Sequence, residues 1–393
     1  MSTYDVIIIG AGAAGLMCAI ESAKRGKKTL ILDHAEKAGE KIRISGGGRC
    51  NFTNLHTSPA NFISQNEHFC KSALKRFSQH DFIKLIEGHN IKWHEKTLGQ
   101  LFCDDSAKQI VNMLLNELAD ANAEIKLETK IESIVKDDNF TVTTSNGTFT
   151  CHSLVIATGG PSIPKMGATG FAYDIAKQFD INVIKPRPAL VPLTFNERIL
   201  EGTKELAGVS VDPVEVSIGK RAKFREALLF THKGLSGPAI LQISSYWNIG
   251  YKILINLLPD KDMFEELKTL KKSNPKIALH NALSQFLPKR LAELIAKQNT
   301  TETSIANLPD KKLKTIANVI HSWQIEPTGT EGFKIAEVTR GGIDTDEVSS
   351  KTFESKKIAG LYFIGEALDV TGQLGGHNFQ WAWSSGYCAG QFV

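Results

Sequence analysis

Three consecutive glycines stand directly before an arginine and a cysteine in KIRISGGGRCNFTN, residues 41–54. Ordering them is costly, because glycine loses more backbone freedom on folding than any other residue. A backbone without side chains can lie flat against a ligand, and an arginine beside it can form two charge-assisted hydrogen bonds with a phosphate. We therefore interpret Gly46, Gly47, Gly48 and Arg49 as a cofactor-binding segment and not as a flexible surface loop.

The N-terminal segment predicts a dinucleotide site. Residues 6–9 form a continuous apolar run, typical of a strand buried on both faces, and GxGxxG follows at Gly10, Gly12 and Gly15. These glycines allow the turn, the approach of a pyrophosphate and close packing of the next helix, in that order. A second strand ends at Asp33, about 20 residues further on, where an acid binds ribose hydroxyls. The acid disfavours NADP and leaves NAD or FAD open.

Two further segments favour FAD over NAD. Residues 124–160 contain a hairpin around Asn146 and Gly147, followed by an apolar strand that ends in Ala-Thr-Gly. A meander of this kind next to a Rossmann sheet is similar to FAD-dependent oxidoreductases of the glutathione-reductase type. Near the C-terminus, another strand ends at Gly365 and Glu366, where FAD enzymes place a Gly-Asp pair against the ribityl chain.

The last helix is expected to begin beside the flavin. A glycine pair leads into an apolar helix near Asn378 and Phe379. Its N-terminus would stabilise negative charge on a reduced flavin, because free N–H groups and the helix dipole are positive there.

Together these segments resemble one family, the HI0933-like or YhiN-like flavoproteins. The resemblance spans nearly the whole chain and rests on GAGAAG, EKIRISGGGRCNFTN, ATGGPSIPKMGATG, LLFTHKGLSGPAILQIS, EVTRGGIDTDEV and GLYFIGEALDVTGQLGGHNFQWAWSSG. Asp33 stands where the family usually has glutamate, and His377 where it usually has tyrosine. The resemblance implies an oxidoreductase, but it does not choose a substrate, because members have been linked to bile-acid enone reduction and to amine oxidation.

The motifs and the resemblance together imply the residues of a flavin site. We expect cofactor contacts from Gly10, Gly12, Ala14, Gly15, Asp33, Lys41, Ser45, Gly46, Gly47, Gly48, Arg49, Cys50, Asn51, Ile131, Thr158, Gly159, Gly365, Glu366, Asp369, Gly376, Asn378, Phe379 and Gln380. The candidate catalytic residues are His377, Cys50 and Asn378. His377 could donate a proton or lie at the surface. For Cys50 we favour packing or cofactor contact over a redox thiol, because no second cysteine lies at short range.

We expect an α/β fold in which a Rossmann-like FAD-binding domain is interrupted by an inserted β-rich domain and a helical subdomain. Short strands punctuated by glycine and proline predict the β-rich part. A helical pattern follows, which Pro288 should kink or split. The expected boundaries are 1–188 and 340–393 for the FAD-binding domain, 189–261 and 323–339 for the β-domain, and 262–322 for the helical subdomain.

Composition and charge restrict the partners. The 393 residues carry a net charge of +4, and we find no targeting or membrane-spanning segment. The six cysteines fit neither a disulfide framework nor a metal site, so we expect a cytoplasmic protein without metal. Lysines gather in the helical part, at Lys268, Lys271, Lys272, Lys276, Lys289, Lys311, Lys312 and Lys314. We interpret them as a solvated face and disfavour nucleic acid, because aromatic residues do not interleave with them.

Our leading hypothesis is an FAD-dependent oxidoreductase that acts on a small organic substrate by hydride transfer through the flavin. NAD(P)H stays open as a transient electron donor, because we can identify only one GxGxxG unit and FAD should occupy it. One alternative is a flavin-dependent tRNA- or RNA-modifying enzyme. A second is a non-enzymatic flavin-binding redox or electron-transfer protein.

Overall fold

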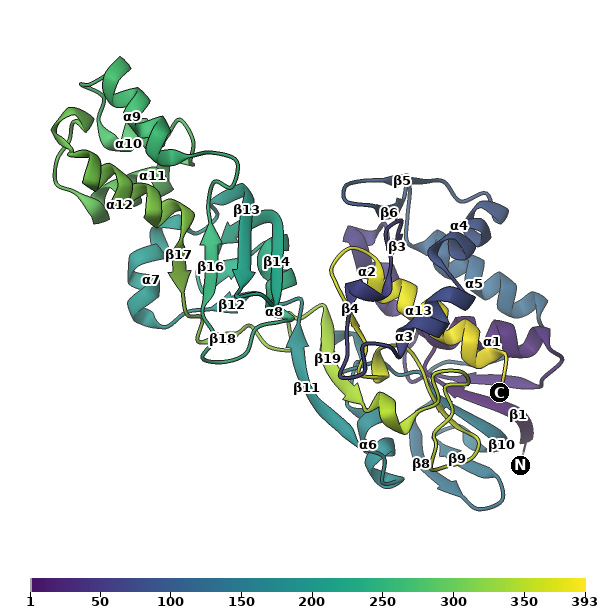
Figure 1. Cartoon of the computed structure of the whole chain (residues 1–393). Helices are drawn as coiled ribbons and strands as arrows, with labels where there is room; N and C mark the ends of the chain where they lie inside the picture. Colours follow the sequence, from purple (N-terminus) through teal and green to yellow (C-terminus); the bar gives the residue numbers. More distant parts are fainter. Residues whose placement is uncertain (1) are drawn as a thin grey trace. The chain divides into compact units, whose positions relative to one another are not determined.

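The computed structural model describes residues 2–393, and the chain forms two compact units (Figure 1). Unit 1 comprises the chain up to Pro188 together with Glu337–Val393, and unit 2 comprises Ala189–Ala336. Each unit has its own hydrophobic core. The mixed α/β architecture with a Rossmann-type domain is confirmed.

Unit 1 is built on a sheet whose central strands are parallel. The order is β7-β2-β1-β10, and β20 pairs with the C-terminal half of β10. Residues 6–9 in β1 are buried, as expected for a strand covered on both faces. These strands are β1 (Ser2–Ile9), β2 (Thr29–Leu32), β7 (Glu124–Lys126), β10 (Gly147–Ile156) and β20 (Leu361–Phe363).

The predicted hairpin is confirmed, and its second strand is longer than expected. β8 (Ile131–Lys136) pairs with β9 (Phe140–Thr144), and β9 pairs with the first half of β10. Thr144 lies opposite Gly147, so the two-residue loop consists of Ser145 and Asn146, one position earlier than the Asn-Gly turn that we expected. We expected one strand for the hairpin and another for LVIATGG, but the single strand β10 forms both. The meander is therefore continuous with the sheet that carries the GxGxxG turn.

Helices α1 (Ala13–Lys24) and α13 (His377–Gly390) pack against each other at very short range. A Cβ at Gly386 would lie 2.4 Å from the carbonyl oxygen of Ala14, so this contact requires glycine. The other elements of unit 1 are α2 (Glu40–Gly48), α3 (Cys70–Arg76), α4 (Gln79–Gly88), α5 (Lys108–Asp120), α6 (Phe171–Gln178), β3 (Asn51–Asn54), β4 (Phe62–Ile63), β5 (Trp93–Glu95), β6 (Gln100–Cys103), β11 (Val183–Ala189), β19 (Val338–Ile343) and β21 (Thr371–Gly372).

Unit 2 contains an antiparallel sheet in the order β17-β16-β13-β14-β15-β12-β18. The helix α8 (Pro238–Ser244) packs on β13 and β14. The segment GLSGPAILQIS therefore forms a short strand followed by a helix. The strands are β12 (Leu193–Thr194), β13 (Ser210–Ile218), β14 (Ala222–Phe230), β15 (Gly234–Ser236), β16 (Ile253–Asn256), β17 (Trp323–Ile325) and β18 (Gly329–Thr330).

The helices of unit 2 share one core with its sheet. Buried residues such as Val216 and Ile255 belong to the same cluster as Leu267 and Ile316 from helices. Pro288 immediately precedes a helix and splits the helical pattern, as predicted. A division of unit 2 into a β-domain and a helical subdomain stays a prediction. The helices are α7 (Glu197–Thr203), α9 (Met263–Ser273), α10 (Leu279–Leu283), α11 (Lys289–Asn299) and α12 (Asp310–His321).

Two further features of the described chain bear on its environment. Within residues 2–393, no helix combines the length and the apolar character that crossing a bilayer requires. All six cysteines are buried and unpaired.

Candidate dinucleotide-binding site

The GxGxxG turn between β1 and α1 has one open glycine and two crowded ones. Gly10 adopts φ 112°, and a Cβ there would lie 2.6 Å from the carbonyl oxygen of Ala157. A Cβ at Gly15 would lie 1.9 Å from the carbonyl oxygen of Gly10. At Gly12, by contrast, no atom lies within 4 Å, and no side chain caps the helix. The open space therefore adjoins the N-terminus of α1, where unsatisfied N–H groups favour an anion.

Asp33 fixes this turn to the end of β2. Its Oδ2 accepts a hydrogen bond from the Ala11 N–H at 2.6 Å, and its Oδ1 accepts one from the Ala35 N–H at 2.8 Å. The Thr129 N–H donates to the Asp33 carbonyl oxygen at 2.8 Å. Ile131, at the start of β8, therefore lies two residues along the chain from a residue bonded to Asp33.

The triple glycine forms a left-handed turn at the end of α2. Gly46, Gly47 and Gly48 adopt φ angles of 58°, 67° and 86°, a succession that side chains would strain. A Cβ at Gly46 would lie 2.8 Å from the Phe102 ring, whereas the last two glycines have nothing within 4 Å. Arg49 follows with an exposed side chain that has no hydrogen-bond or ion-pair partner among residues 2–393. A bare backbone and an available guanidinium thus lie together.

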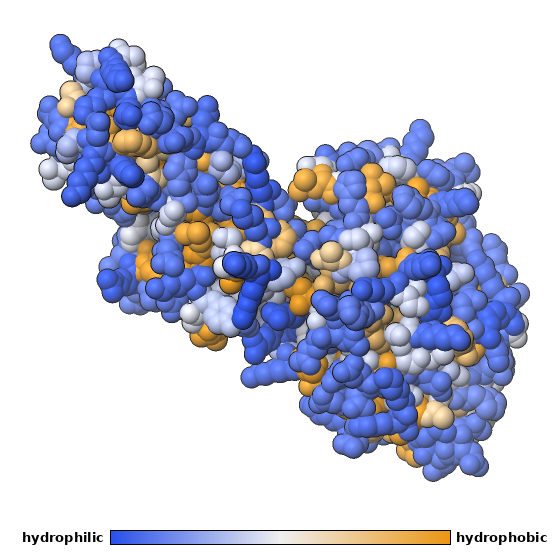
Figure 2. Space-filling model, in the orientation of Figure 1, coloured by the Kyte–Doolittle hydropathy of each residue, from blue (hydrophilic) through white to orange (hydrophobic). Residues whose placement is uncertain are grey.

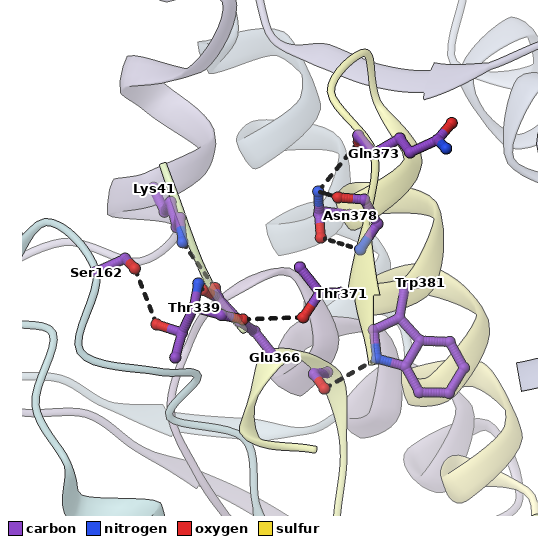
Figure 3. Close-up of polar contacts among 10 residues, drawn as sticks. Lys41, Ser162, Thr339, Glu366, Thr371, Gln373, Asn378 and Trp381 are labelled. Carbon is purple, nitrogen blue, oxygen red and sulfur yellow. Dashed lines mark hydrogen bonds and ion pairs between the residues drawn. The ribbon is translucent and has the colours of Figure 1, made fainter. Parts of the chain in front are cut away.

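Glu366 joins four segments that are distant in the sequence (Figure 3). Its Oε2 lies 2.7 Å from Lys41 Nζ, and its Oε1 accepts a hydrogen bond from the Thr339 N–H at 2.7 Å. Thr339 Oγ1 lies 2.8 Å from Ser162 Oγ. A Cβ at Gly159 would lie 3.7 Å from Glu366 Oε2, so the Ala-Thr-Gly turn is adjacent. Sequence reasoning missed Thr339 and Ser162, although both stand in the motifs that carry the family resemblance.

Two buried hydroxyls near these residues lack a partner within the described chain. Thr158 Oγ1 lies in the turn after β10, and Tyr173 OH lies in α6. Burial raises the pKa of Tyr173, and the carboxylates of Glu366 and Asp369 raise it further. Buried polar atoms are normally hydrogen-bonded. These two orphaned groups therefore indicate where polar atoms of a ligand would complete the site.

His377 is buried, not exposed, and it is not a cationic proton donor at neutral pH. Its Nδ1 lies 3.0 Å from Thr57 Oγ1, and its ring packs edge-on against Phe62. Burial, with a smaller contribution from His56, lowers the pKa of His377 to about 4. The histidine is therefore neutral at pH 7, and its position favours a structural hydrogen bond.

The other two candidate catalytic side chains are also engaged within the protein. Cys50 is fully buried at φ 51°, and burial raises the pKa of its thiol, which favours the packing interpretation over a reactive thiolate. Asn378 Oδ1 accepts from the Gly372 N–H and Nδ2 donates to the Gly372 carbonyl oxygen, each at 2.8 Å (Figure 3). Asn378 thus holds the turn before α13.

Several residues at or near the start of α13 that we expected to contact the cofactor have side chains that interact with other parts of the protein. Gln380 is buried, and its Oε1 accepts from Thr53 Oγ1 at 2.6 Å, which argues against a cofactor contact through this side chain. Asp369 is buried and accepts from the Gln65 N–H at 2.8 Å; burial raises its pKa. The Phe379 ring stacks on another aromatic ring of α13.

The remaining expected residues support the backbone around the site. The Ser45 hydroxyl donates to the Ile42 carbonyl oxygen at 2.8 Å and so ends the regular part of α2. Asn51 lies beside Gly376, whose φ of 98° and tight contact with β3 require glycine. A Cβ at Gly365 would lie 2.9 Å from the Cβ of Ala14, which brings the end of β20 against the first turn of α1.

A family model described as the HI0933-like protein Rossmann domain matches residues 4–392. The chain belongs to this family. The 3-ketosteroid-delta4-(5alpha)-dehydrogenase of Rhodococcus jostii RHA1 shares the fold of this HI0933-like chain, with a TM-score of 0.52 and 14% identity over 99% of this chain and 97% of that one.

Curated relatives of this HI0933-like chain match over nearly their whole length. Proteins named ribosomal RNA dihydrouridine synthase are 50% identical in Escherichia coli K12, over 100% of this chain and 98% of that protein, and 49% identical in Haemophilus influenzae, over 99% and 98%. The 3-dehydro-bile acid delta(4,6)-reductase of Clostridium scindens is 27% identical over 98% and 97%. The chain is an enzyme of this family. The first two names run against our expectation that nucleic acid is a disfavoured partner.

Proposed function

We propose that this chain is an FAD-dependent ribosomal RNA dihydrouridine synthase. The observation that carries the proposal is the 50% identity to the Escherichia coli protein of that name over 98% of its length. This replaces the small organic substrate of our leading hypothesis with the RNA-modifying alternative.

The relatives' names describe related chemistry. Dihydrouridine is uridine whose C5–C6 double bond has been reduced, and the bile-acid relative is named as a reductase of ring double bonds. In uridine this double bond is conjugated with the C4 carbonyl, so the polarised carbon C6 accepts a hydride and C5 accepts a proton. The reaction therefore consumes one two-electron donor and one proton for each uridine.

FAD, when bound and reduced, supplies the hydride equivalent that this reduction needs. We propose NAD(P)H as the class of donor that returns the electron pair. Among residues 2–393, the parallel sheet of unit 1 carries one strand–GxGxxG–helix unit, whereas the sheet of unit 2 is antiparallel. The nicotinamide would therefore bind transiently, without a Rossmann site of its own.

The residues of unit 1 fit FAD. The open backbone at Gly12 and the N-terminus of α1 would bind the pyrophosphate, and Asp33 would bind a ribose hydroxyl. Arg49 has the free guanidinium that a phosphate requires. Glu366 stands at the strand end where the ribityl chain would lie, and the unpartnered Thr158 hydroxyl lies in the adjacent turn. These residues would bind and orient the cofactor.

The decisive experiment combines purified protein with unmodified ribosomal RNA transcribed in vitro and with NADH or NADPH. Nucleoside mass spectrometry should detect dihydrouridine only when protein and reductant are both present. Denatured protein should release FAD. If no dihydrouridine forms with any ribosomal RNA while a steroid enone is reduced, the small-molecule hypothesis replaces this one.

A further inference from the structure

The net positive charge of the chain resides in unit 2. Residues 189–336 contain 20 Lys and Arg against 15 Asp and Glu, a net charge of +5, whereas the whole chain carries +4. Unit 1, which contains the candidate dinucleotide site, therefore carries −1. A polyanionic partner is attracted by unit 2 more strongly than by the unit that holds the cofactor site.

The lysines of the helical part converge because α9 and α12 run antiparallel. Lys271, near the end of α9, donates to the Leu308 carbonyl oxygen at 2.6 Å and pairs with Asp310 at 3.2 Å. At the opposite end, the Met263 N–H donates to His321 Nε2 at 3.1 Å. The C-terminal end of α9 therefore lies against the N-terminal end of α12.

Four more lysines stand at this meeting point, and we call Lys272, Lys276, Lys311 and Lys312 the four-lysine cluster. Three are exposed and Lys312 is half-buried. None of the four forms an ion pair within residues 2–393. Their backbone is held in place, since the Ala306 N–H donates to the Pro275 carbonyl oxygen at 3.1 Å. The positive charges are thus presented on an ordered frame.

Some other lysines of unit 2 are neutralised by neighbours. Lys223 pairs with Glu215 at 2.9 Å, and Lys268 pairs with Glu265 at 3.0 Å. Such pairs offer less net charge to a phosphate than the four-lysine cluster does. The displayed face over the helices of unit 2 is mainly hydrophilic (Figure 2), which suits a polyanion better than an apolar partner.

We propose that the four-lysine cluster binds the phosphate backbone of a double-helical part of the ribosomal RNA substrate. This inference rests on the proposed function. Folded RNA presents phosphates and 2′-hydroxyls along its helices, and lysines bind these phosphates while releasing counterions. The absence of interleaved aromatic residues, which led us to disfavour nucleic acid, excludes only a stacking platform for single-stranded bases.

The test compares two quadruple variants with the same loss of charge. K272Q/K276Q/K311Q/K312Q removes the four-lysine cluster, and K71Q/K75Q/K84Q/K108Q removes four exposed helix lysines of unit 1 that form no ion pair within residues 2–393. Filter binding of in vitro transcribed ribosomal RNA is measured between 50 and 200 mM KCl, about the range in which phosphate contacts dominate affinity. Melting temperature and bound flavin are measured for every variant.

If all four lysines contact phosphates, the cluster variant should lose about 3 to 4 units from the slope of log K against log salt. Its affinity at low salt should fall at least about tenfold, while the control variant stays near wild type. An unchanged slope in a folded cluster variant overturns the inference while leaving the proposed function intact. So does an equal loss in both variants. Wild-type protein that makes no dihydrouridine overturns the proposed function itself.

Discussion

Asp33 uses its carboxylate to hold the fold at the place where a ribose would bind. Both oxygens accept backbone N–H groups, from Ala11 and Ala35. An ionised carboxylate has about four lone-pair positions, so each oxygen can still accept a second hydrogen bond. The same residue can therefore position the GxGxxG turn and bind a ligand.

Replacing Asp33 with alanine should weaken FAD binding by roughly 1.5–3 kcal/mol, because a charge-assisted hydrogen bond is lost and the turn is released. Titration of apo-protein with FAD, followed by flavin fluorescence, measures the change. Asp5→Ala is the matched control. Asp5 also accepts a hydrogen bond from a backbone N–H, that of Lys28 at 2.8 Å, but it lies within β1 and not at the GxGxxG turn. Equal FAD affinity in the Asp33 variant and wild type would remove Asp33 from the ligand set.

The burial of His377 should make the stability of the protein depend on pH. Burial lowers its pKa to about 4, below the ordinary value of about 6.5, so the unfolded chain binds the proton more readily. The stability that neutral His377 contributes is complete above about pH 6.5 and is lost as the pH falls toward 4. Relative to His377→Gln, wild type should lose roughly 3 kcal/mol of unfolding free energy across this interval.

Urea unfolding of both proteins at stepped pH tests this expectation. His152→Gln, which replaces an exposed histidine, should follow wild type throughout. Parallel curves for wild type and His377→Gln would show that His377 is not buried in its neutral form.

Residue roles set by local backbone were accessible from the sequence, and those set by distant partners were not. The positions of the glycines in GxGxxG and in SGGG were sufficient to predict the turns there. The role of His377 depends on Thr57, which is 320 positions away, and that of Glu366 depends on Lys41, 325 positions away. Nothing in the neighbouring residues reveals these two distant partners. Asn378, by contrast, bonds to Gly372 only six positions away.

Among the elements, the contact between α1 and α13 is sensitive to a single added atom. Gly386→Ala places a Cβ 2.4 Å from a backbone oxygen of α1 that cannot move independently. We expect a loss of about 1–3 kcal/mol of stability. FAD affinity should fall as well, because Ala14 lies in the first turn of the helix that would bind the pyrophosphate.

Gly88→Ala is the control for this substitution. Gly88 lies in α4, has no positive φ and has nothing within 4 Å of its added Cβ. Alanine there should be neutral or stabilise by roughly 0.4–1 kcal/mol, through the unfolded state. Thermal unfolding and FAD titration of the two variants should therefore diverge. Equal melting temperatures would show that the helices can separate without penalty.

Strong local signals also decided which elements were predicted correctly. Pro288 split the helical pattern because proline removes an N–H. The Asn-Gly pair located the hairpin, although the loop consists of Ser145 and Asn146, and Gly147 already belongs to β10. The pairing of β11 with β19 joins residues on either side of unit 2, and no local pattern indicates it. The continuity of β10 was missed because its two halves pair with different neighbours.

At the scale of the whole molecule, the presence of one dinucleotide site in the described chain predicts that nicotinamide nucleotides bind weakly and with little selectivity. Tight, selective binding normally needs a helix N-terminus at the pyrophosphate and a residue that reads the ribose. In stopped-flow experiments, the rate of flavin reduction should therefore saturate only at high nucleotide concentration and should differ little between NADH and NADPH. Micromolar saturation with a preference of about a hundredfold would instead indicate a dedicated pocket.

The discontinuity of unit 1 has a consequence for synthesis of the chain on the ribosome. All strands of unit 2 have been made by residue 336, whereas β1 and α1, among the first elements made, still lack β20 and α13. The nascent N-terminal strand must therefore keep its apolar faces protected while more than half of the chain emerges. Thr339, Glu366 and the helix beginning at His377 arrive last, so a prematurely terminated chain cannot assemble this site.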